Sequence, residues 1–285
     1  MTRLILRSRE QAAASVDGDG TSIERPIGAT LIASAGNGDL AQIRAIENVQ
    51  EWINWVSDSG TNSFFAEPAL IKAVRAGHAD VVQFLLDHGA DLGATTPGVK
   101  NSVLMVACFN GHAGIAELLL DCGASYQYVN AESSHALSYG ARFRDVTRLL
   151  LDRGAGSMLV QPGLYSPLHQ ALNLRVSDGF GERIDYGLLP ERQEIVQLLL
   201  DAGADPDATS PFNPGMTVLM SAAFLGCETT HGRLLRAGAN PHARDGNGLT
   251  AADYYRRHMS EVRTPRRYLG DPPEMWSIPS PLHLH

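Results

Sequence analysis

Apolar positions between Pro68 and Asp91 recur with the spacing of two short amphipathic helices. Leu70, Ala73 and Val74 follow the i, i+3, i+4 pattern of one helical face, and the apolar residues within 81–86 repeat it. Isolated helices of about two to three turns are unstable in water, so each must bury its apolar face against a neighbour. The pattern therefore predicts a stack of helical pairs rather than one pair standing alone.

The same unit recurs along the chain and ends each time in the dipeptide Gly-Ala. These dipeptides begin at Gly89, Gly123, Gly154, Gly203 and Gly238, so the successive spacings are 34, 31, 49 and 35 residues. Glycine readily adopts the left-handed conformation that closes a helix at its C-terminus. A period of about 33 residues, made of a turn and two helices, is typical of a helical repeat solenoid.

The residues inside these units resemble those of the ankyrin-repeat family. Residues 166–171 read Ser-Pro-Leu-His-Gln-Ala and match the Thr-Pro-Leu-His-x-Ala opening of that family, with looser copies at 102–107 and 217–222. A Gly-His pair separates the two helices at Gly77 and again at Gly111. The resemblance covers roughly residues 28–260. It implies an all-α ankyrin-repeat solenoid of about six to seven helix-turn-helix repeats, with short turn or β-hairpin fingers.

These motifs divide the chain into three parts. We expect an N-terminal extension at 1–27, a repeat domain at 28–260 and an extended, proline-containing tail at 261–285. The repeats are placed at 29–66, 67–100, 101–132, 133–164, 165–215 and 216–247, followed by a partial cap at 248–260. In the fifth repeat the second helix starts late, so residues 175–190 are predicted as an insertion between its helices. Insertions in solenoids form loops on one face and are frequently functional.

Charge and composition narrow the choice of partner and compartment. The net charge of −8 argues against nucleic acid and favours a protein partner with a basic surface. No apolar run is long enough for a membrane span, so we expect no membrane association. We also expect the chain to be monomeric by itself. Three cysteines in or beside repeat helices favour a reducing, cytoplasmic location. The large excess of arginine over lysine suggests a GC-rich, bacterial coding sequence.

The resemblance also implies where a partner binds. In ankyrin repeats the partner meets the turn tips and the exposed positions of each first helix. Aromatic residues at exposed positions are typical of interfaces. Carried over position by position, these sites are Phe64, Phe65, Glu67, Arg75, Asn101, Phe109, Asn110, Glu132, Tyr165, Asn173, Met216, Phe224 and Leu225.

Two interpretations remain open for the first aromatic pair. Phe64 and Phe65 either face the partner or pack with Trp52 and Trp55 in a satellite core beneath the long connection at 50–67. For the aromatic residues at 109 and 224, which hold the same place in two repeats, we favour the binding surface.

The sequence contains no catalytic motif in the structural context that its chemistry requires. The chain has no Walker loop, His-Glu-x-x-His or Cys-x-x-Cys. Residues 136–140 imitate a nucleophile elbow, but they fall in a predicted repeat helix with no strand before it. His78, His112 and His169 occupy family positions at which histidine bonds to neighbouring backbone. We therefore expect no enzyme activity, no cofactor and no metal site.

Two classes of function stay in view. The leading hypothesis is a non-enzymatic protein-binding scaffold acting as an adaptor, as an inhibitor or immunity-type protein, or as a bacterial effector inside a host. The competing class is a small-molecule-binding or catalytic protein that uses the 175–190 insertion, which holds Asp178, Glu182 and Asp185. A solvated, glycine-rich loop is a poor place to shift a pKa, which argues against catalysis there.

Overall fold

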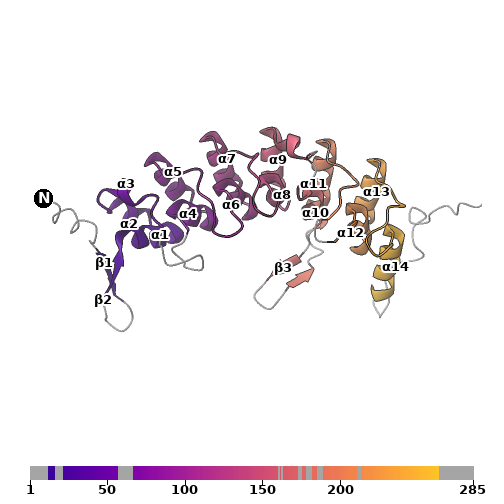
Figure 1. The fold of residues 1–285 in the computed structure, drawn as a ribbon, viewed down its shortest axis with the longest axis horizontal. Coiled ribbons are helices and arrows are strands. Elements are labelled where there is room, and N and C mark those ends of the chain that lie inside the picture. Colours follow the sequence, from indigo (N-terminus) through magenta and orange to yellow (C-terminus); the bar gives the residue numbers. More distant parts are fainter. Residues whose placement is uncertain are drawn as a thin grey trace, which may run out of the picture. The chain divides into compact units, whose positions relative to one another are not determined.

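The computed structural model describes residues 12–16, 22–56, 67–159, 161, 163–172, 175–177, 182–184, 189–210 and 213–262. Its contacts divide the chain into two compact units, Met1–Glu132 and Ser133–His285, which we call unit 1 and unit 2. Each unit is a set of antiparallel helix pairs, as the sequence pattern predicts (Figure 1). No helix in the described ranges is long and apolar enough to cross a membrane.

Unit 1 begins with a hairpin and continues as helix pairs. Strand β1 (Ala12–Val16) pairs antiparallel with β2 (Ser22–Pro26), within the predicted extension. The helices are α1 (Ile27–Asn37), α2 (Leu40–Arg44), α3 (Val49–Trp52), α4 (Ala69–Ala76), α5 (Ala79–Asp87), α6 (Val103–Phe109) and α7 (Ala113–Asp121). The first helices α1, α4 and α6 pack side by side, and α5 packs on α7 in a second layer (Figure 1).

Unit 2 repeats this two-layer arrangement with more irregular parts. Its elements are α8 (Ala136–Gly140), α9 (Arg144–Asp152), the 3₁₀ helix η2 (Ala155–Met158), α10 (Pro167–Ala171), β3 (Arg175–Ser177), β4 (Glu182–Ile184), α11 (Leu189–Asp201), α12 (Val218–Phe224), α13 (Glu228–Arg236) and α14 (Ala251–Val262). Helix α10 contacts α8 and α12 in one layer, and α11 contacts α9 and α13 in the other. The antiparallel β3–β4 hairpin lies in the predicted insertion (Figure 1).

In both helices of the second repeat, the apolar positions predicted to face the core are buried. Leu70, Ala73 and Val74 of α4 are buried, and so are Val81 and Leu85 of α5. Deleting the atoms of a buried leucine typically costs about 2–5 kcal/mol, so these contacts account for much of what holds neighbouring pairs together. The helical periodicity read from the sequence is confirmed here.

Histidine and glycine meet at the turn between the two helices of a pair. Gly77 has φ of +86°, and a Cβ there would lie 2.8 Å from Cε1 of His112 in the next repeat. The Nε2 atom of His112 lies 3.2 Å from the carbonyl oxygen of Arg75, and that of His78 lies 3.2 Å from Gly36 O. The predicted role of these histidines in bonding to neighbouring backbone is therefore confirmed.

The closing glycines need their residue type for backbone conformation alone. Gly89, Gly123, Gly154, Gly203 and Gly238 have φ between +89° and +98°. A Cβ at Gly89, Gly123, Gly203 or Gly238 would meet nothing within 4 Å. L-residues rarely adopt this region, and glycine adopts it freely. Beyond them lie the predicted β-hairpin fingers, seen as antiparallel bridges between Thr95 and Ser102 and between Thr209 and Thr217.

Several boundaries differ from the sequence expectation. Helix α1 starts at Ile27, one residue inside the predicted extension. The long connection after the first repeat contains α3, and the Trp55 ring lies so close to α1 that a Cβ on Gly28 would fall 2.3 Å from Trp55 Cδ2. Helix α8 forms despite its degraded opening motif but has only five residues.

The free cysteines differ from one another in exposure, because Cys122 is exposed while Cys108 and Cys227 are buried.

Candidate functional site

One position recurs at the C-terminal end of three first helices. This position stands twelve residues before the last residue of the second helix of the same repeat. It is occupied by Arg75, Phe109 and Phe224, which we call one row of the repeat pattern. The phenylalanines are 43% and 39% exposed, in unit 1 and unit 2 respectively. Most large apolar side chains of the described residues are buried, which makes this exposure unusual.

Phe224 belongs to a small surface cluster on unit 2. Its ring meets Tyr254 of α14 edge to face, with the centroids 6.3 Å apart. The guanidinium of Arg257 lies 5.9 Å from the centroid of the same tyrosine ring. Leu225, also expected at the site, is half-buried directly after Phe224. We call Phe224, Leu225, Tyr254 and Arg257 the α12–α14 patch.

The structure brings together two charged residues of the predicted site in unit 1. Oε1 of Glu67 lies 2.5 Å from Nη2 of Arg75, and Oε2 lies 3.1 Å from Nζ of Lys72. The guanidinium of Arg75 is 45% exposed, whereas the carboxylate side chain is 13% exposed. Arg75 therefore presents a partly neutralised charge rather than an isolated cation.

The two predicted asparagines of unit 1 are engaged in local structure. Asn101 accepts a 2.6 Å hydrogen bond at Oδ1 from Asn130, and its backbone N donates to Thr96 Oγ1 at 3.0 Å. Asn110 Nδ2 donates to Val106 O at 2.8 Å, at the end of α6. Glu132 is exposed, and its backbone N donates to Asn130 Oδ1 at 2.9 Å. These side chains shape the finger and the helix end that carry the exposed residues.

Two further predicted residues are half-buried in unit 2. Tyr165 donates its hydroxyl to Gln170 Oε1 at 3.3 Å, and burial raises the pKa of that hydroxyl above its ordinary value. Met216 accepts at its carbonyl oxygen from His169 Nε2, over 3.2 Å. His169 thus plays the backbone-bonding role expected from the opening motif. Phe64, Phe65 and Asn173 lie outside the described residues.

Sequence reasoning missed two exposed apolar residues on a finger of unit 1. Tyr128 is 36% exposed and Val129 is 37% exposed. They stand between the closing Gly123-Ala124 and the predicted Glu132, so the finger position itself was the signal that could have identified them.

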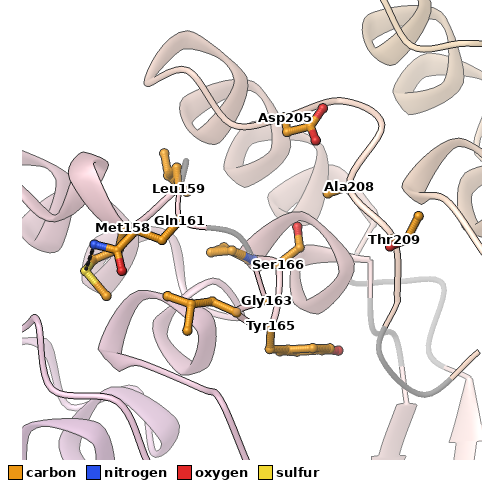
Figure 2. Close-up of a pocket in the computed structure, with 11 residues that line it drawn as sticks. Met158, Leu159, Gln161, Gly163, Tyr165, Ser166, Asp205, Ala208 and Thr209 are labelled. Atoms are coloured by element: carbon orange, nitrogen blue, oxygen red, sulfur yellow. Dashed lines mark hydrogen bonds between the residues drawn. The ribbon is translucent and has the colours of Figure 1, made fainter. Parts of the chain in front are cut away.

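A pocket of about 430 Å³ lies within unit 2, between the segment after η2 and the next finger. Figure 2 shows Met158, Leu159 and Gln161 on one side and Asp205, Ala208 and Thr209 on the other. The segment 163–167, from Gly163 to Pro167, completes the lining. The Asp205 carboxylate already accepts from Asp207 N at 2.9 Å, and Gln161 donates to the Met158 sulfur at 3.6 Å. The pocket suits an apolar side chain better than a charged ligand.

The buried ionisable groups are arranged for stability rather than for nucleophilic chemistry. Burial lowers the pKa of His135, His169 and His231 to about 4, so all three are neutral at pH 7. Burial raises the pKa of Cys227 to about 12 and raises that of Cys108 as well, so neither thiol forms a reactive thiolate. Among the described side chains, no group of three or more His, Cys, Asp or Glu could hold a metal ion.

Comparison with known proteins agrees with this architecture. Residues 31–130 match the family model of ankyrin repeats in three copies. The human ASB11 ankyrin repeat domain is 21% identical with a TM-score of 0.60, covering 83% of this chain and 99% of its own. The ankyrin repeat domain of Bcl-3, a member of the IκB protein family, is 21% identical with a TM-score of 0.56, covering 82% and 97%.

A more distant match is a complex from Bdellovibrio bacteriovorus between a predatory endopeptidase and an immunity protein, at 18% identity, a TM-score of 0.46, and coverage of 81% of this chain and 92% of that one. Because its TM-score is below 0.5, this likeness says nothing about function. No curated protein matches the sequence significantly. At these identities the solved structures establish the fold alone. The family model shows that residues 31–130 are ankyrin repeats, and the solved structures show that the rest of the repeat domain has the same fold. Ankyrin repeats are generally protein–protein interaction modules.

Proposed function

We propose that this protein is a non-enzymatic scaffold that binds a partner protein through the fingers and the exposed ends of its first helices, the face that is concave in this family. The observation that carries the proposal is the exposure of Phe109 and Phe224 at the same row of two different repeats. Both follow a buried neighbour, Cys108 in α6 and Ala223 in α12, so the helix presents the ring outward while its core face stays filled.

Exposed aromatic rings suit binding because they combine large apolar area with little conformational entropy. Burying such a ring in a partner's pocket is typically worth about 1–3 kcal/mol. In unit 1 the finger residues Tyr128 and Val129 add apolar contact area. In unit 2 the α12–α14 patch supplies Tyr254 and the cation of Arg257 beside the phenylalanine.

Charge and compartment refine the proposed partner. The net charge of −8 favours a protein with a basic surface, and electrostatic attraction of this kind mainly speeds association. The cysteine pattern supports action in a reducing cytoplasm, and the arginine-rich composition supports a bacterial source. An adaptor, an immunity-type inhibitor and an effector all use such a surface. A gene that encodes a toxin next to this one would favour the inhibitor.

The test is affinity purification of the full chain followed by measurement of Kd for the partner it retains. Phe109→Ala and Phe224→Ala are each expected to weaken that Kd about 5- to 150-fold, which corresponds to about 1–3 kcal/mol. Gln83→Ala, at an exposed position of α5, is the control and should leave the Kd unchanged. Normal binding by both phenylalanine variants, measured while they remain folded, would place the interface elsewhere.

A further inference from the structure

Charge is unevenly distributed along the chain. Residues 233–285 contain eight arginines and five carboxylate side chains, whereas residues 1–232 contain 15 lysines and arginines against 26 carboxylates. The acidic balance of the whole protein therefore does not extend to its C-terminal part, which includes α14 and its side of the α12–α14 patch. The preference for a basic partner, which follows from the net charge, belongs to the rest of the protein.

The carboxylates beside the α12–α14 patch are already engaged. Asp245 accepts at Oδ2 from the Tyr254 hydroxyl at 2.7 Å and at Oδ1 from the backbone N of Leu249 at 2.8 Å. Asp253 pairs with Arg256, with Oδ1 2.6 Å from Nη1. Neither carboxylate pairs with the arginine of the patch.

That arginine, Arg257, is exposed and lies over an aromatic ring. Among the described side chains, no carboxylate forms an ion pair with its guanidinium. A guanidinium stacked on a ring keeps its N–H groups for another partner, and a carboxylate can accept two of them in parallel. In unit 1, by contrast, Arg75 is paired with Glu67 at 2.5 Å.

The aromatic rings of the patch are held in place before a partner binds. The hydroxyl of Tyr254 is anchored on Asp245, and its ring meets Phe224 of the adjacent helix α12 edge to face (Figure 1). Phe224 is 39% exposed, and Leu225 beside it is half-buried. Side chains that are already ordered lose little conformational entropy on binding. The patch therefore offers a fixed apolar surface next to an exposed cation.

We propose that the α12–α14 patch binds a peptide segment of the partner that carries an apolar side chain next to a glutamate or aspartate. The apolar side chain packs on Phe224 and Leu225, and the carboxylate accepts N–H groups from Arg257. Charge complementarity selects this occupant, because a lysine or arginine in the same place would be repelled. The inference rests on the proposed function and deepens it by naming the chemistry of the segment that this part of the surface takes.

The first test uses a library of random dodecapeptides, selected in parallel on the full chain and on its Arg257→Gln variant. We expect the parent chain to enrich peptides with an acidic residue close to an aromatic or large aliphatic one. The variant should lose the acidic preference and keep the apolar one. No enrichment on the parent, or the same acidic preference on both chains, would overturn the proposal.

The Kd of the most enriched peptide then tests the individual contacts. Arg257→Gln is expected to weaken binding about three- to tenfold, and Phe224→Ala about tenfold. Arg236→Gln, which removes an exposed arginine of α13, is the matched control and should leave the Kd unchanged. Arg257→Glu should bind a peptide whose acidic residue is replaced by lysine better than it binds the original peptide. Failure of this charge exchange would overturn direct pairing.

One carboxylate of α14 needs its own variant. Glu261 follows Arg257 by four residues, the spacing of an ion pair within a helix. Glu261→Gln removes this competitor for the guanidinium, so the variant is expected to bind the peptide at least as tightly as the parent does. Weaker binding would show that the peptide needs this carboxylate and would contradict the proposal.

A partner retained by affinity purification separates this inference from the proposed function. Weaker partner binding in Phe109→Ala together with normal binding in Arg257→Glu would keep the proposed function and overturn the acidic segment. Normal binding in Phe109→Ala, Phe224→Ala and Arg257→Glu would overturn both. Weaker binding in all three variants, with the loss in Arg257→Glu shrinking at high salt, is the expected result.

Discussion

The turn between paired helices differs between unit 1 and the α8–α9 and α10–α11 pairs of unit 2, whereas the α12–α13 turn of unit 2 again has a histidine, His258, packed on a glycine, Gly226. In unit 1, a histidine covers a glycine and bonds to a free carbonyl, so every buried polar atom of that contact has a use. In those two pairs of unit 2, Arg142 takes the glycine position and Arg192 the histidine position, and the Gly140 carbonyl is occupied from within its own repeat. The first arrangement is sufficient for stacking. The second places the side chain of Arg192 inside the protein, where it is only 4% exposed.

The two units differ in their buried ionisable side chains as well. The described part of unit 1 buries Thr30, Ser34, Thr96 and Asn130, which are neutral at every ordinary pH. Unit 2 buries the ionisable side chains of His135, His169, His231, Arg192 and Asp245. The comparison suggests that unit 1 is the regular scaffold and that unit 2 responds to its surroundings.

The largest expected effect tests whether the two units share one kind of core. Leu85→Ala in unit 1 and Leu199→Ala in unit 2 each remove a side chain with 0% exposure and should each cost about 2–5 kcal/mol of unfolding free energy. Because repeats contact only their neighbours, hydrogen exchange should rise first in the altered unit. A uniform rise along the whole chain would contradict that local coupling.

The next effect is acid lability confined to unit 2. The folded pKa of its three buried histidines, about 4, lies below the ordinary value of 6.5, so the unfolded chain binds more protons between these limits. The stabilising contribution of the neutral histidines is therefore fully present above pH 6.5 and is lost as the pH drops toward 4. At pH 5 the loss in unfolding free energy is about 2 kcal/mol per histidine. Hydrogen exchange at pH 7 and pH 5, corrected for its intrinsic rate, measures the loss in each unit.

A matched pair of variants isolates the histidine contribution. His135→Leu removes one protonation site from the core and should flatten the pH dependence of unit 2, because nothing titrates in its place. Leu137→Val, at a fully buried position of α8 just after the His135 N-cap, lowers stability while leaving the pH slope unchanged. Equal slopes in His135→Leu and the parent would show that this histidine is not buried in its neutral form.

A smaller effect distinguishes the two exposed phenylalanines. Phe224→Ala removes the edge-to-face contact with Tyr254 and should cost about 0.5–1.5 kcal/mol of stability in addition to its effect on binding. Tyr254→Leu is the companion variant, and a double-mutant cycle measured by denaturant unfolding yields the coupling energy. A coupling energy of zero would mean that the two rings only lie near each other.

The smallest expected effect concerns the charges of unit 1. Glu67→Gln removes the ion pairs to Lys72 and Arg75 and should cost about 1 kcal/mol, because the side-chain oxygen of glutamine still accepts a hydrogen bond at this position, where Glu67 and Lys72 are both only 13% exposed. It also leaves the Arg75 charge unopposed, which should slow association with a basic partner more than it changes dissociation. Association rates compared at low and high salt test this, because screening removes the difference.

The fold was predictable because its determinants are local and periodic. The spacing of Leu70, Ala73 and Val74 requires a helix with one buried face, and the closing glycine at 89 meets a backbone conformation that other residues avoid. Repetition of both signals along the chain predicts the stack without any long-range information. The exposure of the row at 109 and 224 follows from the same phase.

The sequence by itself therefore determined the repeat, the helix phase and the histidine turns, because each depends on residues a few positions apart. Only the tertiary structure decided which distant side chains meet. It placed Trp55 against Gly28, joined Asn101 to Asn130 and paired Glu67 with Arg75. It also showed that the Gly140 carbonyl is already occupied beside Arg192. Such contacts depend on the residue at which each helix ends and on the direction that the chain takes in the following loop or insertion. The periodic pattern of apolar residues specifies neither.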